Sequence, residues 1–309
     1  MSGEQQTPSG ILVFDKPQGF TSHDVVAKLR GILRTRKIGH GGTLDPMATG
    51  VLPIFVGGAT KAADYAAAQD KTYEAGFTLG FSTDTQDTTG TVTAQSEKRV
   101  TEDEVRAALN TFLGAQKQVP PMYSAIKIDG QKLYDLARKG KEVERPARDI
   151  TILDIALLDF DEQAQKGAFR VTCSKGTYVR TIVHDLGQKL GTCAAMHALT
   201  RIRSGVYTLA QAVTFETVER ARDDGTLGRL FQPTDSLFAD DPAVRLTAEG
   251  RDRALRGAVV FPRQAEGLAA LAPGTLCRVY APDGQFLMLG RADTLDKGGI
   301  GLFVHKNFR

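Results

Sequence analysis

The stretch from His40 to Ile54, HGGTLDPMATGVLPI, places one carboxylate in a glycine-rich turn beside a histidine. Neither Asp45 nor His40 has an ordinary structural task there, so the stretch is a candidate reaction centre. Asp45 precedes Pro46, and an Asp-Pro dipeptide most often forms a turn that caps the next segment. Taken alone the dipeptide indicates such a turn, so the chemistry must be judged from the surrounding residues.

A carboxylate that attacks a sugar or a base must stay ionised in a partly dry pocket, so it needs a cation nearby to offset desolvation. Arg180, in the segment CSKGTYVRTI, is the best candidate. It falls in the first turn of a helix predicted for Thr177–Leu190, about 100° around the helix from the apolar Val179. A cation there opposes the helix dipole unless an anion lies beside it. We therefore predict that Arg180 has an anionic partner.

Other residues of the candidate site have plain structural explanations when taken singly. Tyr73 begins the alternating segment KTYEAGFTLG, which predicts a half-buried strand with Tyr73 on its apolar face. Tyr178 stands next to the candidate cation. His40, flanked by glycine, could be an ordinary loop residue, and Leu199, in the pattern ALTR, reads as a helical leucine.

These segments together resemble the TruB family of tRNA pseudouridine synthases, over roughly residues 10–235. HGGTLDPMATGVLPI resembles the family signature, and DKPQGFTSHDVV, KTYEAGFTLG and CSKGTYVRTI resemble its first, second and third motifs. PPMYSAIKIDGQKLYDLARKG resembles a further stretch that is specific to the family.

By this resemblance Asp45 is the catalytic nucleophile, Arg180 pairs with it, and Tyr73 stacks on the target base and assists proton removal. The remaining site residues hold the nucleotide or shape the pocket: His40, Tyr178, Leu199 and Lys16. The reaction implied is the isomerisation of uridine 55 in the T-loop of tRNA to pseudouridine, with no cofactor and no metal. The implied partner is the T-arm stem-loop of tRNA.

Three alternatives stay open. A guide-RNA-dependent relative would share the motifs, although the compact N-terminus, with the first motif near Ile11, argues against it. A non-catalytic tRNA-binding or folding chaperone would not need Asp45, Tyr73 and Arg180 together. A carboxylate glycosidase would need a second acid across the bond, and no other carboxylate stands out as one.

Strands and helices interleave without strict βαβ alternation, which predicts an α+β fold with a mixed, largely antiparallel sheet. Thr101 and Glu104 form a capping box that predicts a helix over Thr101–Leu113. The pattern changes near residue 242, where short strands begin. We expect a disordered segment at 1–9, a pseudouridine synthase catalytic domain at 10–242, and a small β-rich domain that resembles a PUA RNA-binding domain at 243–309.

The formal net charge of the 309 residues is +3 and the pI is about 8.7, below the value of about 9 that would by itself suggest nucleic-acid binding. The basic residues are nevertheless grouped. Two runs stand out: Lys28, Arg30, Arg34, Arg36 and Lys37, and then Lys127, Lys132, Arg138, Lys139, Lys141, Arg145 and Arg148. Each run fits either a solvated helix face or a basic rim around an RNA site.

Cys173, Cys193 and Cys277 are too few for a disulfide framework and suit a reducing compartment. Cys193 and His197 are four apart, but no CxxC pair supports a metal site, so we expect packing roles for them and for His184. The sequence has neither a secretory signal nor an apolar run near the roughly 20 residues of a membrane helix. We expect a cytoplasmic monomer with no obligate protein partner.

Overall fold

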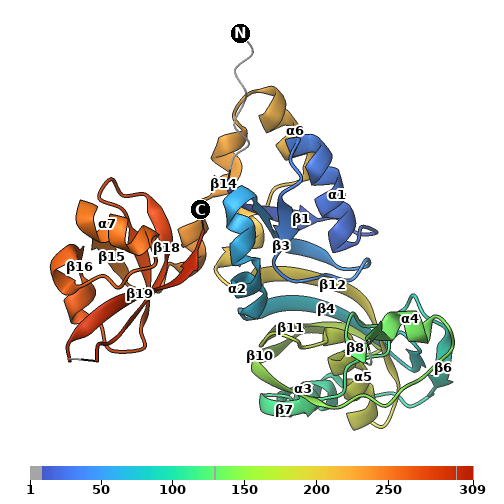
Figure 1. Ribbon diagram of the computed structural model, residues 1–309. Coiled ribbons are helices and arrows are strands. Elements are labelled where there is room, and N and C mark those ends of the chain that lie inside the picture. Colours follow the sequence, from blue (N-terminus) through green and yellow to red (C-terminus); the bar gives the residue numbers. More distant parts are fainter. Residues whose placement is uncertain (1–8, 129, 297, 309) are drawn as a thin grey trace.

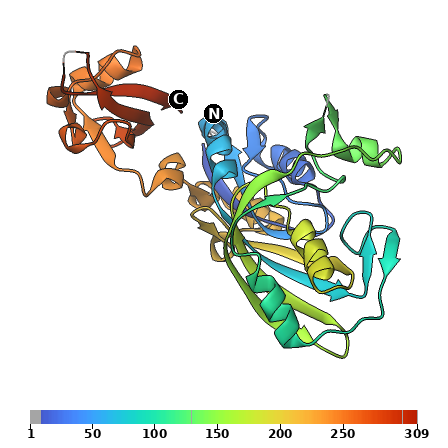
Figure 2. The same cartoon turned by 90° about the horizontal axis from the view of Figure 1, so that it is seen from below.

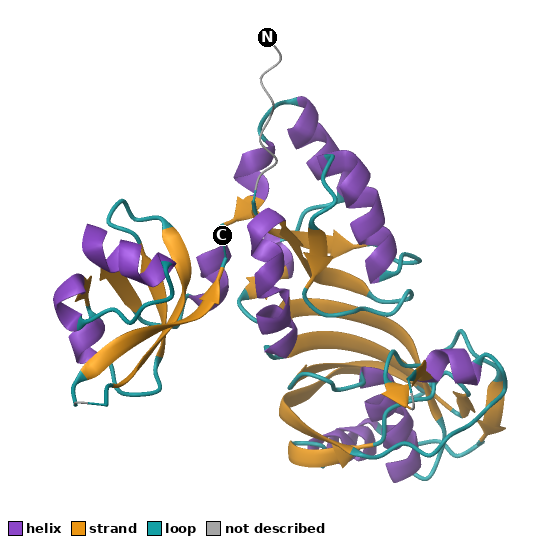
Figure 3. Cartoon of the chain, in the orientation of Figure 1, coloured by secondary structure: helices purple, strands orange, loops and turns teal. Residues whose placement is uncertain are grey.

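The computed structural model describes residues 9–128, 130–296 and 298–308. Residues 1–8, part of the segment expected to be disordered, lie outside the described residues. The described chain builds a large sheet flanked by helices and a second, smaller sheet at the C-terminal end (Figures 1 and 3). Helices, mixed strands and a β-rich C-terminal unit confirm the predicted α+β class.

The large sheet has ten strands, and their main path runs β14-β1-β3-β12-β4-β11-β10-β7, with β2 on β3 and β13 on β12. Its strands are β1 (Gly10–Lys16), β2 (Ile38–His40), β3 (Thr49–Val56), β4 (Lys71–Leu79), β7 (Gly114–Gln118), β10 (Arg148–Asp161), β11 (Lys166–Cys173), β12 (Ala194–Ser204), β13 (Tyr207–Thr208) and β14 (Phe231–Gln232). All pairings named in this path are antiparallel except that of β12 with β3. The centre of the sheet, β3-β12-β4, carries the candidate site.

Helices and short hairpins surround this sheet. They are α1 (Ser22–Leu33), α2 (Ala63–Ala68), α3 (Glu102–Asn110), α4 (Leu133–Ala137), α5 (Val179–Lys189), α6 (Phe215–Asp223), the hairpin β5 (Phe81–Thr83) with β6 (Val92–Gln95), and the hairpin β8 (Lys127–Ile128) with β9 (Gln131–Lys132). Thr101 and Glu104 form the predicted capping box. The helix that follows is shorter than predicted and ends at Asn110, because Gly114, with φ of 95°, already begins β7.

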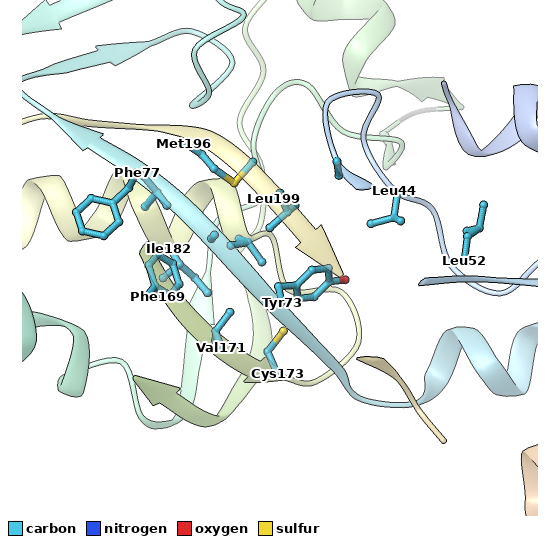
Figure 4. Close-up of a cluster of buried hydrophobic side chains, with 14 of the residues drawn as sticks. Leu44, Leu52, Tyr73, Phe77, Phe169, Val171, Cys173, Ile182, Met196 and Leu199 are labelled. Atoms are coloured by element: carbon cyan, nitrogen blue, oxygen red, sulfur yellow. The ribbon is translucent and has the colours of Figure 1, made fainter. Parts of the chain in front are cut away.

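The strand predicted at β4 is present, but it is not half-buried, because every residue except Glu74 is buried. Its apolar face packs against α5. Tyr73 and Phe77 of β4 share one buried apolar cluster with Phe169 and Val171 of β11 and Ile182 of α5 (Figure 4). Full burial of an apolar side chain of this size contributes about 1.5–3 kcal/mol. This packing fixes α5 against the middle of the sheet, and with it the first turn of α5.

The C-terminal unit has five strands in the order β16-β15-β17-β18-β19. They are β15 (Ala243–Leu246), β16 (Ala265–Glu266), β17 (Leu276–Tyr280), β18 (Phe286–Thr294) and β19 (Ile300–Asn307), with helix α7 (Ala248–Leu255). Figure 2 shows the unit to one side of the large sheet. Besides its own core, it contributes Phe286, Leu289 and Phe308 to an apolar cluster that also contains Phe55 and Phe238.

Candidate active site

The loop that carries Asp45 joins β2 to β3 and is held by hydrogen bonds to helix α1. The hydroxyl of Ser22, in the first turn of α1, accepts a hydrogen bond from the Leu44 amide at 2.9 Å and donates one to its carbonyl at 3.3 Å. The Asp45 carbonyl accepts from the Ala48 amide at 3.0 Å, so the Asp-Pro dipeptide does form a turn. The carboxylate is 36% exposed and therefore reaches open space.

Arg180 lies beside Asp45, with 2.9 Å between Nε and Oδ2. Its side chain is only 5% exposed, and it stands in the first turn of α5, whose N-cap residue is Tyr178. The carboxylate offsets the unfavourable position of a cation at a helix N-terminus. The structure thus brings together two predicted site residues that are far apart in the sequence.

A second carboxylate, Asp87, lies near the same guanidinium and was not found by reasoning from the sequence. Its Oδ2 is 3.7 Å from Nη1 of Arg180, and its side chain is 7% exposed. Its other oxygen accepts hydrogen bonds from the hydroxyls of Thr85 and Thr89 at 2.8 and 2.6 Å. Asp87 is thereby held in place to face Arg180.

Although the Asp45 side chain is partly exposed, desolvation by the surrounding protein is the largest influence on the pKa of its carboxyl group. Desolvation raises the pKa of its carboxyl group, and the Arg180 guanidinium is the largest opposing influence. Asp87 raises the pKa further, whereas Lys16 lowers it. The ionised form of Asp45 therefore depends on the cations beside it.

Tyr73 and Leu199 lie on the adjacent strands β4 and β12 (Figure 4). Tyr73 is 9% exposed, and burial raises the pKa of its phenol. Tyr73 is also close enough to Asp45 for the charge of that carboxylate to raise the pKa of the phenol further. Leu199 pairs with Ala75 of β4 and is 7% exposed. The expectation that Leu199 is a helical leucine is wrong, because it belongs to strand β12, in which a bulge between Met196 and Ala198 breaks the alternation that would have marked a strand.

The backbone of Tyr178 is held by the side chain of Gln118. The Tyr178 N–H donates to Gln118 Oε1 at 2.8 Å, and Gln118 Nε2 donates to the Tyr178 carbonyl oxygen at 3.1 Å. Burial raises the pKa of its phenol, and the charge of Asp45 raises it further. The side chain is half-buried near Asp45, as a pocket wall would be.

Lys16 ends β1 with its side chain fully buried. Its ammonium group donates to the carbonyl oxygens of Phe20 at 2.6 Å, Pro17 at 3.0 Å and Pro46 at 3.3 Å. Burial lowers its pKa to about 8. Lys16 thus ties the residue after Asp45 to the turn that follows β1, and forms part of the floor beneath the loop.

His40 ends β2, with its ring centroid 5.3 Å from that of His23 in an edge-on arrangement. Burial lowers the pKa of His40 to about 4, so its imidazole is neutral at physiological pH. Within the described part of the chain, its Nδ1 atom is buried without a hydrogen-bond partner. The position suits packing or stacking rather than proton transfer.

The structure does not gather the cysteines and histidines into a metal site. Cys173 is buried in β11 and Cys277 in β17, while His197 bonds to the Thr78 hydroxyl at 3.0 Å through Nδ1. Among the described residues, no group of three His, Cys, Asp or Glu side chains could hold a metal ion. Across those same residues, none of the helices combines the length and apolar character needed to cross a membrane.

Residues of both basic runs are found on the surface of the protein. All five residues of the first run are exposed on α1 and the segment after it. In the second run, the residues around the β8-β9 hairpin and α4 line one open pocket: Lys127, Lys132, Arg138 and Lys139, together with Asp135. Both runs thus present clustered cations to solvent.

Two family profiles match nearly all of the large-sheet region. The profile described as "TruB family pseudouridylate synthase (N terminal domain)" matches residues 30–179, and that described as "tRNA pseudouridylate synthase B C-terminal domain" matches residues 180–239. The chain is 46% identical over 295 residues to the tRNA pseudouridine synthase B of Bacillus velezensis, covering 94% of this chain and 95% of that protein. It is 47% identical over 266 residues to that of Lactiplantibacillus plantarum, covering 84% and 86%.

Solved structures give a similar result. A crystal structure of a Cbf5-Nop10-Gar1 complex contains a chain that superposes with a TM-score of 0.75 at 26% identity, covering 99% of this chain and 87% of that one. An H/ACA RNP bound to a substrate RNA containing 2′-deoxyuridine contains another, with a TM-score of 0.73 at 25% identity, covering 99% and 87%.

Proposed function

Because the chain belongs to the TruB family of pseudouridylate synthases, and is thus an enzyme that isomerises uridine to pseudouridine, we propose that its substrate is uridine 55 in the T-loop of tRNA. Asp45 is the nucleophile, and no cofactor or metal takes part. The T-arm stem-loop is the partner, and the enzyme works in the cytoplasm as a monomer. The observation that carries the proposal is the contact between Asp45 and Arg180 at 2.9 Å, in a loop that leaves the carboxylate partly open.

In the proposed reaction the N1 glycosidic bond of the uridine breaks, the base turns within the pocket, and C5 is joined to the same sugar carbon. The hydrogen on C5 leaves as a proton and N1 gains one, so the product is an isomer of the substrate. Arg180 keeps Asp45 ionised against the effect of burial. Nucleophilic catalysis by the carboxylate divides one difficult step into two easier ones.

Tyr73 is proposed to stack on the target base and to assist removal of the C5 proton. Burial raises the pKa of its phenol, so the resting group is a neutral hydroxyl. It therefore assists as a hydrogen-bonding group and not as a standing phenolate. His40, Tyr178 and Leu199 are proposed to hold the nucleotide and shape the pocket. Lys16, which is fully buried, is proposed to shape its floor from beneath the Asp45 loop.

The relatives' names support a tRNA substrate, as do the exposed basic runs on α1 and around α4. A uridine in a loop can be turned out of its stack for a few kcal/mol, and single-stranded loops expose base edges to protein side chains. The β-rich unit from residue 243 onward is proposed to be a PUA-like domain that adds RNA-binding surface.

A guide-RNA-dependent activity is the second candidate, because the structural likeness to chains of a Cbf5-Nop10-Gar1 complex and an H/ACA RNP extends over 99% of this chain. One assay separates the two. The isolated protein is incubated with a bare tRNA transcript tritiated at uridine C5, and tritium release to water is measured. Release with a transcript whose only tritiated uridine is at position 55 supports the proposal, and no release without a guide RNA contradicts it.

A further inference from the structure

Arg201 is a buried cation that no step of the proposed reaction uses. Its side chain is 1% exposed, and it is among the largest fully buried side chains of the described residues. Among the ion pairs of those residues, none includes Arg201. Burying a charge without a carboxylate partner is costly, so the placement calls for a function.

The guanidinium of Arg201 holds both ends of the Asp45 loop. Its Nε atom donates to the Val51 carbonyl at 2.6 Å, after the loop, and Nη2 donates to the Gly42 carbonyl at 3.1 Å, before it. One rigid planar group thus links the two ends of the loop. Lys16 and Ser22 hold the middle of the loop through hydrogen bonds to the carbonyl oxygens of Pro46 and Leu44.

The same residue faces the strand that carries Tyr73. Arg201 pairs with Tyr73 across β12 and β4, and with Gly50 across β12 and β3. The backbones are so close that a Cβ on Gly50 would lie 2.3 Å from the Arg201 carbonyl oxygen. The register of β12 against β4 shifts between Arg201 and Arg203, and such bulges are common next to active sites.

We infer that Arg201 is a positioning residue, which fixes the Asp45 loop relative to Tyr73 so that the nucleophile and the stacking residue keep one spacing. It acts through the backbone at Gly42 and Val51 and through its cross-strand position, without touching the uridine. The inference rests on the proposed function, because it assumes that Asp45 and Tyr73 act on the same base. Its charge also opposes the effect of burial on the pKa of Tyr73.

The test compares Arg201→Lys and Arg201→Gln with Arg203→Lys. Arg203 lies on the same strand, and its guanidinium donates to the Thr72 hydroxyl at 3.1 Å and the Gly205 carbonyl at 2.9 Å, neither of them on the Asp45 loop. Neither lysine nor glutamine can bind Gly42 and Val51 as the guanidinium does. Single-turnover tritium release is measured with enzyme in saturating excess, and tRNA affinity is measured separately.

A displacement of about 1 Å at a reacting group can lower a rate about 100-fold, so we expect a fall of that order in the single-turnover rate constant of both Arg201 variants. The tRNA dissociation constant should change by less than about threefold, because no RNA contact is lost. Arg203→Lys should keep the parental rate constant. Because the enzyme is in saturating excess, unfolded molecules in the preparation would not change the rate constant of the folded ones. Unfolding of part of the sample therefore cannot imitate the result.

Parental rate constants in both Arg201 variants would overturn the inference, as would failure of both to fold, which would make Arg201 a residue of the fold as a whole. Asp45→Asn is assayed in parallel to distinguish failure of the proposed function from failure of the inference about Arg201. If Asp45→Asn is active, the proposed function fails. If it is inactive while the Arg201 variants are fully active, only the inference about Arg201 fails.

Discussion

The Nε atom of Arg180 lies 2.9 Å from Oδ2 of Asp45, while the other two nitrogens of the guanidinium bind backbone oxygens elsewhere. Nη1 donates to the Thr85 carbonyl at 3.0 Å, and Nη2 donates to the Tyr123 carbonyl at 2.9 Å. The cation is therefore fixed independently of Asp45. The carboxylate meets a charge whose position is already set, which is the property expected of a preorganised site.

Asp45→Asn should reduce tritium release below detection, because the amide is nearly isosteric but is not a nucleophile. The folded state raises the pKa of Asp45, so at neutral pH the ionised carboxylate disfavours folding, and a neutral amide should not lower the thermal midpoint. Release is measured alongside thermal unfolding. Asp149→Asn, at an exposed ion pair with Lys117, is the control and should stay active. Release at the parental rate by Asp45→Asn would refute the proposed nucleophile.

Arg180→Lys should lower the single-turnover rate about 100-fold although the charge is kept, because one ammonium group cannot span Asp45 and two carbonyl oxygens. The two lost contacts should also destabilise the fold by about 3 kcal/mol. Rate and urea unfolding are both measured. Arg170→Lys is the control, because it alters an ion pair with Glu74 in which the two side chains are 47% and 37% exposed. It should change neither the single-turnover rate nor the stability to urea much. Equal effects of the two substitutions would show that the Arg180 geometry is unimportant.

Asp87→Asn tests the carboxylate that was found only in the structure. An amide keeps an oxygen that can accept from Thr85 and Thr89 but removes the charge beside Arg180. Because Asp87 raises the pKa of Asp45, the acid limb of the rate profile should move to lower pH. We also expect a rate loss of about tenfold, the equivalent of about 1.4 kcal/mol. An unshifted acid limb together with a parental rate would show that Asp87 does not contribute to the reaction.

The pH dependence of the parental enzyme should show an acid limb that belongs to Asp45. Its pKa is raised by burial, so the nucleophile becomes protonated, and the rate falls, at a higher pH than for an ordinary aspartate. Single-turnover rates from about pH 4 to pH 9 give the profile. The His40 pKa of about 4 is lowered by burial, so the limb should persist in His40→Phe. Loss of the limb in that variant would assign it to the histidine.

Deleting residues 243–309 should leave pseudouridine formation detectable but require more tRNA for saturation, because the site residues precede the cut. Each lost phosphate contact should reduce the slope of log affinity against log salt by roughly 0.7–0.9. Removal of Phe286 and Phe308 also uncovers Phe55 and Phe238, so the thermal midpoint should fall. Affinity is titrated at several salt concentrations, and superimposable curves would show that this unit does not bind the substrate.

Much of the fold could be predicted from short local patterns in the sequence. The alternation around Tyr73 and the capping box of Thr101 and Glu104 are complete within ten residues, so β4 and α3 were predictable. β12 was not, because its bulges place buried residues side by side and hide the period of two. The end of α3 was missed because β7 takes up the chain from Gly114.

The proposed site residues could be named from the sequence where a segment has a motif, but not where a residue contributes only through a distant contact. Asp87 lies in TDTQDTTG, a polar segment of the kind that forms ordinary turns. Its partner Arg180 is far away in the sequence, and only the packing of α5 brings them together. Arg201 gave no local signal either, since an arginine is usually exposed and its burial here results from the close approach of β12 to β3.

The apolar cluster that joins the C-terminal unit to the large sheet has a consequence for how the protein folds. Phe55 stands on β3 and Phe308 follows more than 250 positions later, yet both belong to that one cluster. Contacts between residues so distant in sequence form slowly, since a long loop must close first. During synthesis we therefore expect the apolar surface around Phe55 to remain incompletely covered until β18 and β19 have been made, which favours aggregation of the nascent chain over that interval.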